Sequence, residues 1–227
     1  MLKLLNTLGV RSLTELLFPS RCIACSKLGI SICLDCERSW QPSIYKKELI
    51  TPNGTYPVLS AIPYSEIASK IILSSKENNL SVADQLIAAA ISPTVKYFCD
   101  QYGTGVLVPI PSRKSAIRKR GRNFLMEILE KVAQDNSLNI TPVLFHVRAV
   151  QDQSKLNQSQ RRINITDALS ADSKNQVRKF RENIEPVILV DDLMTTGSTL
   201  VEAVRALHSA GYEVKGAVTC AFAQPLR

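Results

Sequence analysis

Two hydrophobic periods alternate along the chain, one typical of helices and one typical of buried strands. Apolar residues at helical spacing predict helices over residues 65–73, 81–98, 123–133 and 198–208. Short β-branched runs between them predict strands over residues 106–110, 142–147, 187–190 and 214–221. Strands that alternate with helices predict an α/β fold, a parallel sheet flanked by helices, with ligands at the carboxyl ends of the strands.

The first 18 residues have a different pattern, that of an amphipathic helix. Its leucine stripe is most simply a face packed on the rest of the protein, and a membrane or partner surface is the alternative; the stripe consists of Leu5, Leu8, Leu13, Leu16 and Leu17. No apolar run approaches the roughly 18 residues of a transmembrane helix. No small-residue cleavage site follows the stripe, so we expect a cytoplasmic protein.

Four cysteines follow in two closely spaced pairs, Cys22-x-x-Cys25 and Cys33-x-x-Cys36. Paired C-x-x-C turns aim two thiolates each at one centre, which is typical of a closed tetrahedral zinc site. Two disulfides or four free thiols are the alternatives, and disulfides require an oxidising compartment. Residues 41–57 then carry three prolines and the Asn53-Gly54 turn signal, which indicates a connector. We therefore expect a helix and zinc module over residues 1–45 and a second domain over residues 58–227.

The composition indicates a basic protein that favours anionic partners. The 227 residues include 28 Lys and Arg against 20 Asp and Glu, a formal net charge of +8 that attracts phosphates, nucleic acids or anionic membranes. The 45% hydrophobic content excludes disordered and collagen-like chains. Six basic residues and no acid lie within residues 113–122; they either neutralise a polyanion or form a solvated loop.

A second basic set is interleaved with amide side chains over residues 148–164. Its cations are Arg148, Lys155, Arg161 and Arg162. Amides can bind bases or sugars as well as phosphates, so this segment is interpreted as a mobile loop that closes over a ligand or as a groove for single-stranded DNA. Aromatic residues are scarce in both basic segments, which gives base stacking only weak support.

The most informative motif follows the wholly apolar strand 187–190. Two carboxylates come first, and a turn rich in hydroxyl groups then opens a helix. The free N–H groups of a helix start, together with hydroxyls, can bind a phosphate. Adjacent carboxylates can accept hydrogen bonds from ribose hydroxyls or bind Mg²⁺. An ordinary strand-to-helix turn is the simpler alternative. The motif comprises Asp191, Asp192, Thr195, Thr196, Gly197, Ser198 and Thr199.

This motif resembles the phosphoribosyl diphosphate (PRPP) signature of type I phosphoribosyltransferases. The chain as a whole resembles the ComF late-competence family in its cysteine pairs, residues 108–111, the cluster 118–123 and residues 148–164. The resemblance implies that Asp191 and Asp192 hold the ribose hydroxyls and that residues 195–199 hold the 5′-phosphate. It also implies a pyrophosphate-facing basic loop with Ser112, Arg113, Arg118 and Arg120. One departure is Arg122, where the family has an apolar Phe.

Two functions follow from the resemblance. The first is a DNA-uptake accessory protein that keeps the PRPP site and uses its zinc module and basic face toward single-stranded DNA, a helicase and a recombination mediator. The alternative is an active phosphoribosyltransferase that uses Mg-PRPP and releases pyrophosphate. Structural Zn²⁺ and ligand-associated Mg²⁺ are the expected metals.

Overall fold

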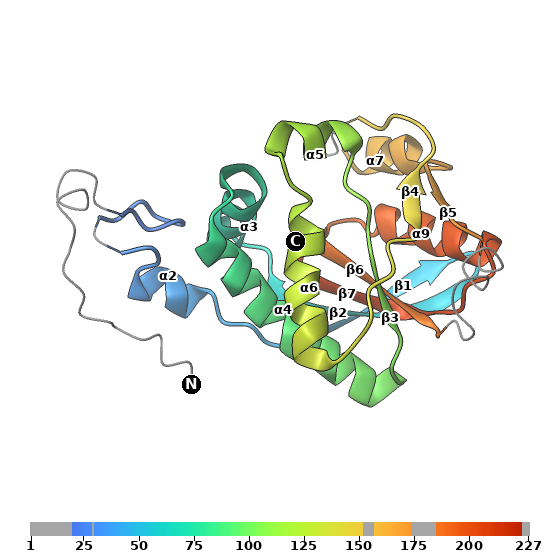
Figure 1. The fold of residues 1–227 in the computed structure, drawn as a ribbon, viewed down its shortest axis with the longest axis horizontal. Coiled ribbons are helices and arrows are strands. Elements are labelled where there is room, and N and C mark those ends of the chain that lie inside the picture. Colours follow the sequence, from blue (N-terminus) through green and yellow to red (C-terminus); the bar gives the residue numbers. More distant parts are fainter. Residues whose placement is uncertain (1–19, 29, 152–156, 174–184, 224–227) are drawn as a thin grey trace.

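The structure is a computed structural model that describes residues 20–28, 30–151, 157–173 and 185–223 (Figure 1). The predicted N-terminal helix and Lys155 of the second basic set lie outside these residues. The main sheet has five strands in the order β1-β2-β7-β6-β3. Its strands are β1 (Tyr45–Thr51), β2 (Gly54–Pro63), β3 (Val106–Pro109), β6 (Val187–Met194) and β7 (Val214–Phe222). All neighbours are parallel except the β1-β2 pair, so the predicted parallel α/β architecture is confirmed.

Helices cover both faces of this sheet because its strands are apolar on both sides. One face packs on α3 (Glu66–Asn78), α4 (Ser81–Tyr102) and α6 (Phe124–Asn136). The opposite face packs on α9 (Ser198–Ser209) and on a small antiparallel pair, β4 (Leu144–His146) and β5 (Leu169–Ala171). Alternation along β6 shows the division, since Ile188 and Val190 join the first core and Val187 and Leu189 join the second.

The connector predicted over residues 41–57 is wrong for most of its length, because β1 and β2 form an antiparallel hairpin there. The Asn53-Gly54 signal does mark the turn between them. β1 is an edge strand with exposed Lys47 and Glu48, and its polarity concealed it. Charged side chains on an edge strand hinder pairing with other chains. Pro57 is tolerated because β2 begins to pair with β7 only at Val58.

Three short helices complete the described chain: α2 (Leu34–Ser39), α5 (Lys114–Arg120) and α7 (Gln158–Ile165). Figure 1 shows α2 at one end of the molecule, beyond α3, and α5 and α7 together at the top. The two basic segments thus contain helical turns in place of the expected loops. None of the helices in the described ranges combines the length and apolar character that crossing a bilayer requires.

Candidate functional site

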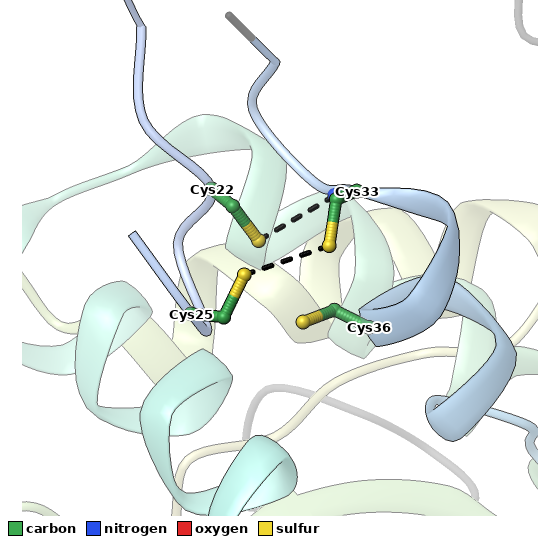
Figure 2. A group of neighbouring side chains, drawn as sticks. All are labelled: Cys22, Cys25, Cys33 and Cys36. Atoms are coloured by element: carbon green, nitrogen blue, oxygen red, sulfur yellow. Dashed lines mark hydrogen bonds between the residues drawn. The ribbon is translucent and has the colours of Figure 1, made fainter. Parts of the chain in front are cut away.

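The four cysteines of the two C-x-x-C pairs converge on one point. Figure 2 shows Cys22, Cys25, Cys33 and Cys36 with their side chains turned toward one another, and their four Sγ atoms lie within 4.8 Å of one another. A zinc ion bound at about 2.3 Å to four tetrahedral thiolates requires sulfur separations of this order. The donor set and the geometry are thus compatible with a structural zinc ion.

Backbone groups of the module favour the thiolate form of Cys22. The Cys33 N–H points at the Cys22 Sγ, 3.4 Å away, as the dashed line in Figure 2 marks. Burial raises the pKa of the Cys22 thiol, but the N–H groups of Cys25, Cys33 and Ala24 outweigh it and lower this pKa to about 6. A thiolate is the form that ligates a metal.

Helix α3 packs directly on this module. The Ser74 hydroxyl donates to the Ile23 carbonyl at 3.4 Å, and the apolar core of the module is continuous with the core under α3 and α4. Trp40, which follows α2, is buried in that core. The cysteine module is therefore docked against the α/β domain.

A cavity of about 360 Å³ lies at the carboxyl ends of β3 and β6. Nine of the residues predicted for the ligand site line it: Ser112, Arg113, Arg120, Asp191, Asp192, Thr195, Gly197, Ser198 and Thr199. The other two predicted residues do not line it. Arg118 is exposed on α5, and the Thr196 hydroxyl is 2.8 Å from the Ser198 Oγ.

The acidic pair lies within β6 and not beyond its end. β6 continues to Met194, and Asp191 pairs with Thr219 of β7. Asp192 is buried, and its Oδ2 forms an ion pair of 2.5 Å with the Lys76 ammonium of α3. The pair is therefore anchored in the sheet, which corrects the prediction that the strand ends before the two carboxylates.

The two carboxyls titrate in opposite directions. Burial raises the pKa of Asp191 well above its usual value, and the Asp192 charge raises it further. Burial also opposes ionisation of Asp192, but the Lys76 ammonium outweighs this effect and lowers the Asp192 pKa. The ion pair with Lys76 thus favours the ionised form of Asp192, whereas burial and the Asp192 charge oppose ionisation of Asp191.

The turn after β6 has the geometry that an anion site needs. Gly197 precedes α9 with a φ of 76°, in the left-handed region that favours glycine. The Cβ of any other residue there would lie 2.9 Å from the Leu49 side chain. Ser198 and Thr199 at the N-terminus of α9 line the cavity, where the helix dipole favours negative charge.

His146 supports the opposite wall of the cavity. Its Nε2–H donates to the Pro111 carbonyl at 3.0 Å, next to Ser112 and Arg113. Burial lowers the pKa of His146, and this effect outweighs that of the Pro111 carbonyl. His146 falls within a predicted strand, but the sequence gives no sign of this contact, because the contact depends on the β4-β5 pair packing beside the loop after β3.

Two of the basic residues in and directly after α5 form ion pairs within the protein. Arg120 pairs with Glu77 of α3 at 3.1 Å, and Arg122 pairs with Asp84 of α4 at 2.9 Å. Arg122 also lies 3.1 Å from Glu127, and its side chain is only 8% exposed. Arg122 is thus a buried structural residue, and grouping it with surface cations is wrong.

Phe124, next to this junction, provides the apolar anchor that Arg122 lacks. Its buried ring is close to two cations, the Lys76 ammonium at 5.1 Å and the Arg120 guanidinium at 5.6 Å from the ring centre. Such contacts stabilise a cation against an aromatic face. They hold both side chains at the cavity.

The second basic segment reaches the same cavity through Gln151 and Arg161. The Asn164 amide binds both the N–H and the carbonyl of Gln151, at 2.9 and 3.1 Å, and so fixes its backbone. Asn157 caps α7 in a reciprocal pair with Gln160. The sequence of this segment predicts either a loop that closes over a ligand or a groove for single-stranded DNA. Its place at the cavity favours the first interpretation.

A comparison with protein-family models agrees with this description of the fold. Residues 116–225 match the family model of the phosphoribosyl transferase domain. The match includes the acidic pair and the α9 turn but not the cysteine module, α3 or Arg113. The expected α/β fold of phosphoribosyltransferase type is thus confirmed.

One similar solved chain is titled the allosteric regulatory enzyme of purine biosynthesis. The identity is 18% and the TM-score 0.31, and the match covers 60% of this chain and 26% of that enzyme. The matching region thus spans about a quarter of the enzyme's length. No curated protein matches the chain.

Proposed function

We propose that this chain binds PRPP in the cavity between β3, β6 and α9. The observation that carries the proposal is that one cavity is lined by three features suited to this ligand. These are the acidic pair of β6, the N-terminus of α9 and the basic loop after β3. In this assignment Asp191 and Asp192 accept hydrogen bonds from the ribose hydroxyls, and the α9 N-terminus with Ser198 and Thr199 holds the 5′-phosphate. Ser112 and Arg113, across the cavity, face the pyrophosphate.

Mg²⁺ fits the same assignment in its donor chemistry. Carboxylate oxygens are the ligands that this hard cation takes in proteins, and the cation would itself favour ionisation of the Asp191 carboxyl at the cavity wall. When bound, the ion would neutralise pyrophosphate charge and so assist departure of that group. The protein's own share is to orient the ribose and to supply the Arg113 and Arg120 charges beside the pyrophosphate.

Titration calorimetry with PRPP tests this proposal on the zinc-loaded protein. We expect binding of one PRPP per chain, tighter than binding of ribose 5-phosphate, because the pyrophosphate adds contacts with cationic side chains. Pyrophosphate release in the presence of a panel of nitrogenous bases tests the alternative, transfer of the phosphoribosyl group. Equal affinity for the two sugars, or no binding of PRPP, would contradict the proposed site.

We also propose a ComF-type role in DNA uptake, in which the PRPP site serves as a sensor or scaffold and a basic face binds single-stranded DNA. The resemblance to the ComF family supports this role, as do the exposed side chains of Lys114, Arg118 and Lys119 on α5. A helicase and a recombination mediator are the proposed protein partners.

Replacing Lys114, Arg118 and Lys119 by Gln tests the DNA-binding face. We expect weaker binding of single-stranded DNA and a flatter salt dependence, by about 0.7 in logarithmic slope for each phosphate that the variant no longer neutralises. PRPP affinity should change little, because none of the three side chains lines the cavity. Gel shifts over a salt series, beside PRPP titrations, make the measurement. An unchanged slope with reduced PRPP affinity would overturn the DNA assignment.

A further inference from the structure

Lys76 places a positive charge inside the ligand site without being part of the sequence motif. It belongs to the last turn of α3, yet its side chain is only 24% exposed and lines the cavity. The ammonium contacts the Asp192 carboxylate and lies 5.1 Å from the centre of the Phe124 ring. A lysine near a helix end ordinarily extends into water, so this side chain is held by its partners.

The charges around Lys76 come from several elements. Asp191 and Asp192 of β6 attract it, whereas Arg120 of α5 repels it. Burying an ammonium is costly, and an ion pair recovers that cost only in good geometry. An apolar side chain of similar length would pack against Phe124 without this cost. The cation therefore has its use in the chemistry of the acidic pair and not in packing.

We propose that Lys76 is the resident counter-ion of Asp191 and Asp192, and that it decides which cation this pair accepts. The ammonium occupies one side of Asp192, at the distance of direct contact. A free divalent cation approaching the pair meets a positive charge already in place. A divalent ion then enters the site with a diphosphate-bearing ligand, which supplies further negative oxygens, and not alone.

This inference adds a specificity-determining residue to the proposed PRPP site. A carboxylate can accept a ribose hydroxyl at one oxygen while an ammonium holds the other. Lys76 thus leaves the pair able to bind a sugar while it excludes a bare metal ion. Because α3 lies outside the matched residues 116–225, the matching domain motif does not include this residue.

Metal binding without any sugar ligand tests the inference. Mn²⁺ titrations of the zinc-loaded protein, followed by electron paramagnetic resonance, compare the wild type with Lys76→Met and Lys76→Arg. We expect Lys76→Met to bind Mn²⁺ at least about tenfold more tightly than the wild type, because a like charge at contact distance has been removed. Lys76→Arg retains the charge and should stay close to the wild type. Lys76→Gln carries the same expectation as Lys76→Met if the Met variant does not fold.

The double variant Lys76→Met with Asp192→Asn is the matched control, and it should lose the added Mn²⁺ affinity. Equal Mn²⁺ affinity of the wild type and Lys76→Met would overturn the inference, as would added affinity that survives Asp192→Asn. These titrations contain no PRPP. Failure of the wild type to bind PRPP would therefore remove the proposed function and leave the Mn²⁺ result to decide the role of Lys76.

Discussion

Replacing Asp191 and Asp192 together by Asn should reduce PRPP affinity at least about 100-fold. Each hydrogen bond from a ribose hydroxyl to a carboxylate contributes about 1.5–3 kcal/mol, and two such bonds account for this loss. Asn is chosen over Ala because Asp192 is buried against Lys76, and a truncated side chain would leave a cavity there as well. Calorimetric titration of PRPP measures the change.

Two further variants keep this result interpretable. The single change Asp191→Asn leaves the Lys76–Asp192 ion pair in place, so the fold should persist while part of the affinity is lost. Asp100→Asn removes an exposed carboxylate at the far end of α4 and should bind PRPP as the wild type does. Wild-type affinity in a folded Asp191→Asn, Asp192→Asn double variant would show that the ribose assignment is wrong.

The second large effect concerns the cysteine module. The purified protein should contain about one zinc ion per chain, and Cys25→Ser should lose it, because structural zinc supplies the folding free energy of such small modules. Zinc binding of this kind is worth about 10–16 kcal/mol, so residues 20–40 should unfold when the site is broken. Elemental analysis gives the zinc content, and limited proteolysis reports the unfolding.

Cys99→Ser is the control for the zinc experiment. Cys99 lies on α4, apart from the four clustered thiols, and is half-buried. This variant should keep its zinc and resist proteolysis as the parent does. Freshly prepared, reduced wild-type protein without zinc would refute the metal assignment, and equal zinc loss in Cys99→Ser would show that the effect is not specific to the cluster.

The sequence predicted what local chemistry determines. Gly197 before α9 and the spacing of the cysteines have local physical requirements, and both features are where the pattern placed them. β1 was missed because an edge strand needs no apolar alternation, and its Lys-rich stretch resembles a loop. The predicted end of β6 at Val190 was wrong because pairing with β7 keeps Asp191 and Asp192 in the sheet.

Ion pairs between residues far apart in the sequence were the other feature that could not be predicted. Nothing near Lys76 in the sequence indicates that its ammonium will meet Asp192, because that contact depends on how α3 packs over the sheet. The same holds for Arg122, whose neighbours in the chain are basic while its partners Asp84 and Glu127 come from α4 and α6. Charge runs in a sequence therefore overstate the free positive surface of the folded protein.

The central position of β7 has a consequence for how the protein is made. β7 lies between β2 and β6, yet it is the last strand of the sheet to leave the ribosome. Until then β2 and β6 each expose an unpaired edge, and such edges pair readily with other chains. The nascent chain can form its hairpin and helices early, but the sheet closes only after β7 emerges. Aggregation during synthesis is therefore most dangerous just before that moment, and chaperone protection matters most there.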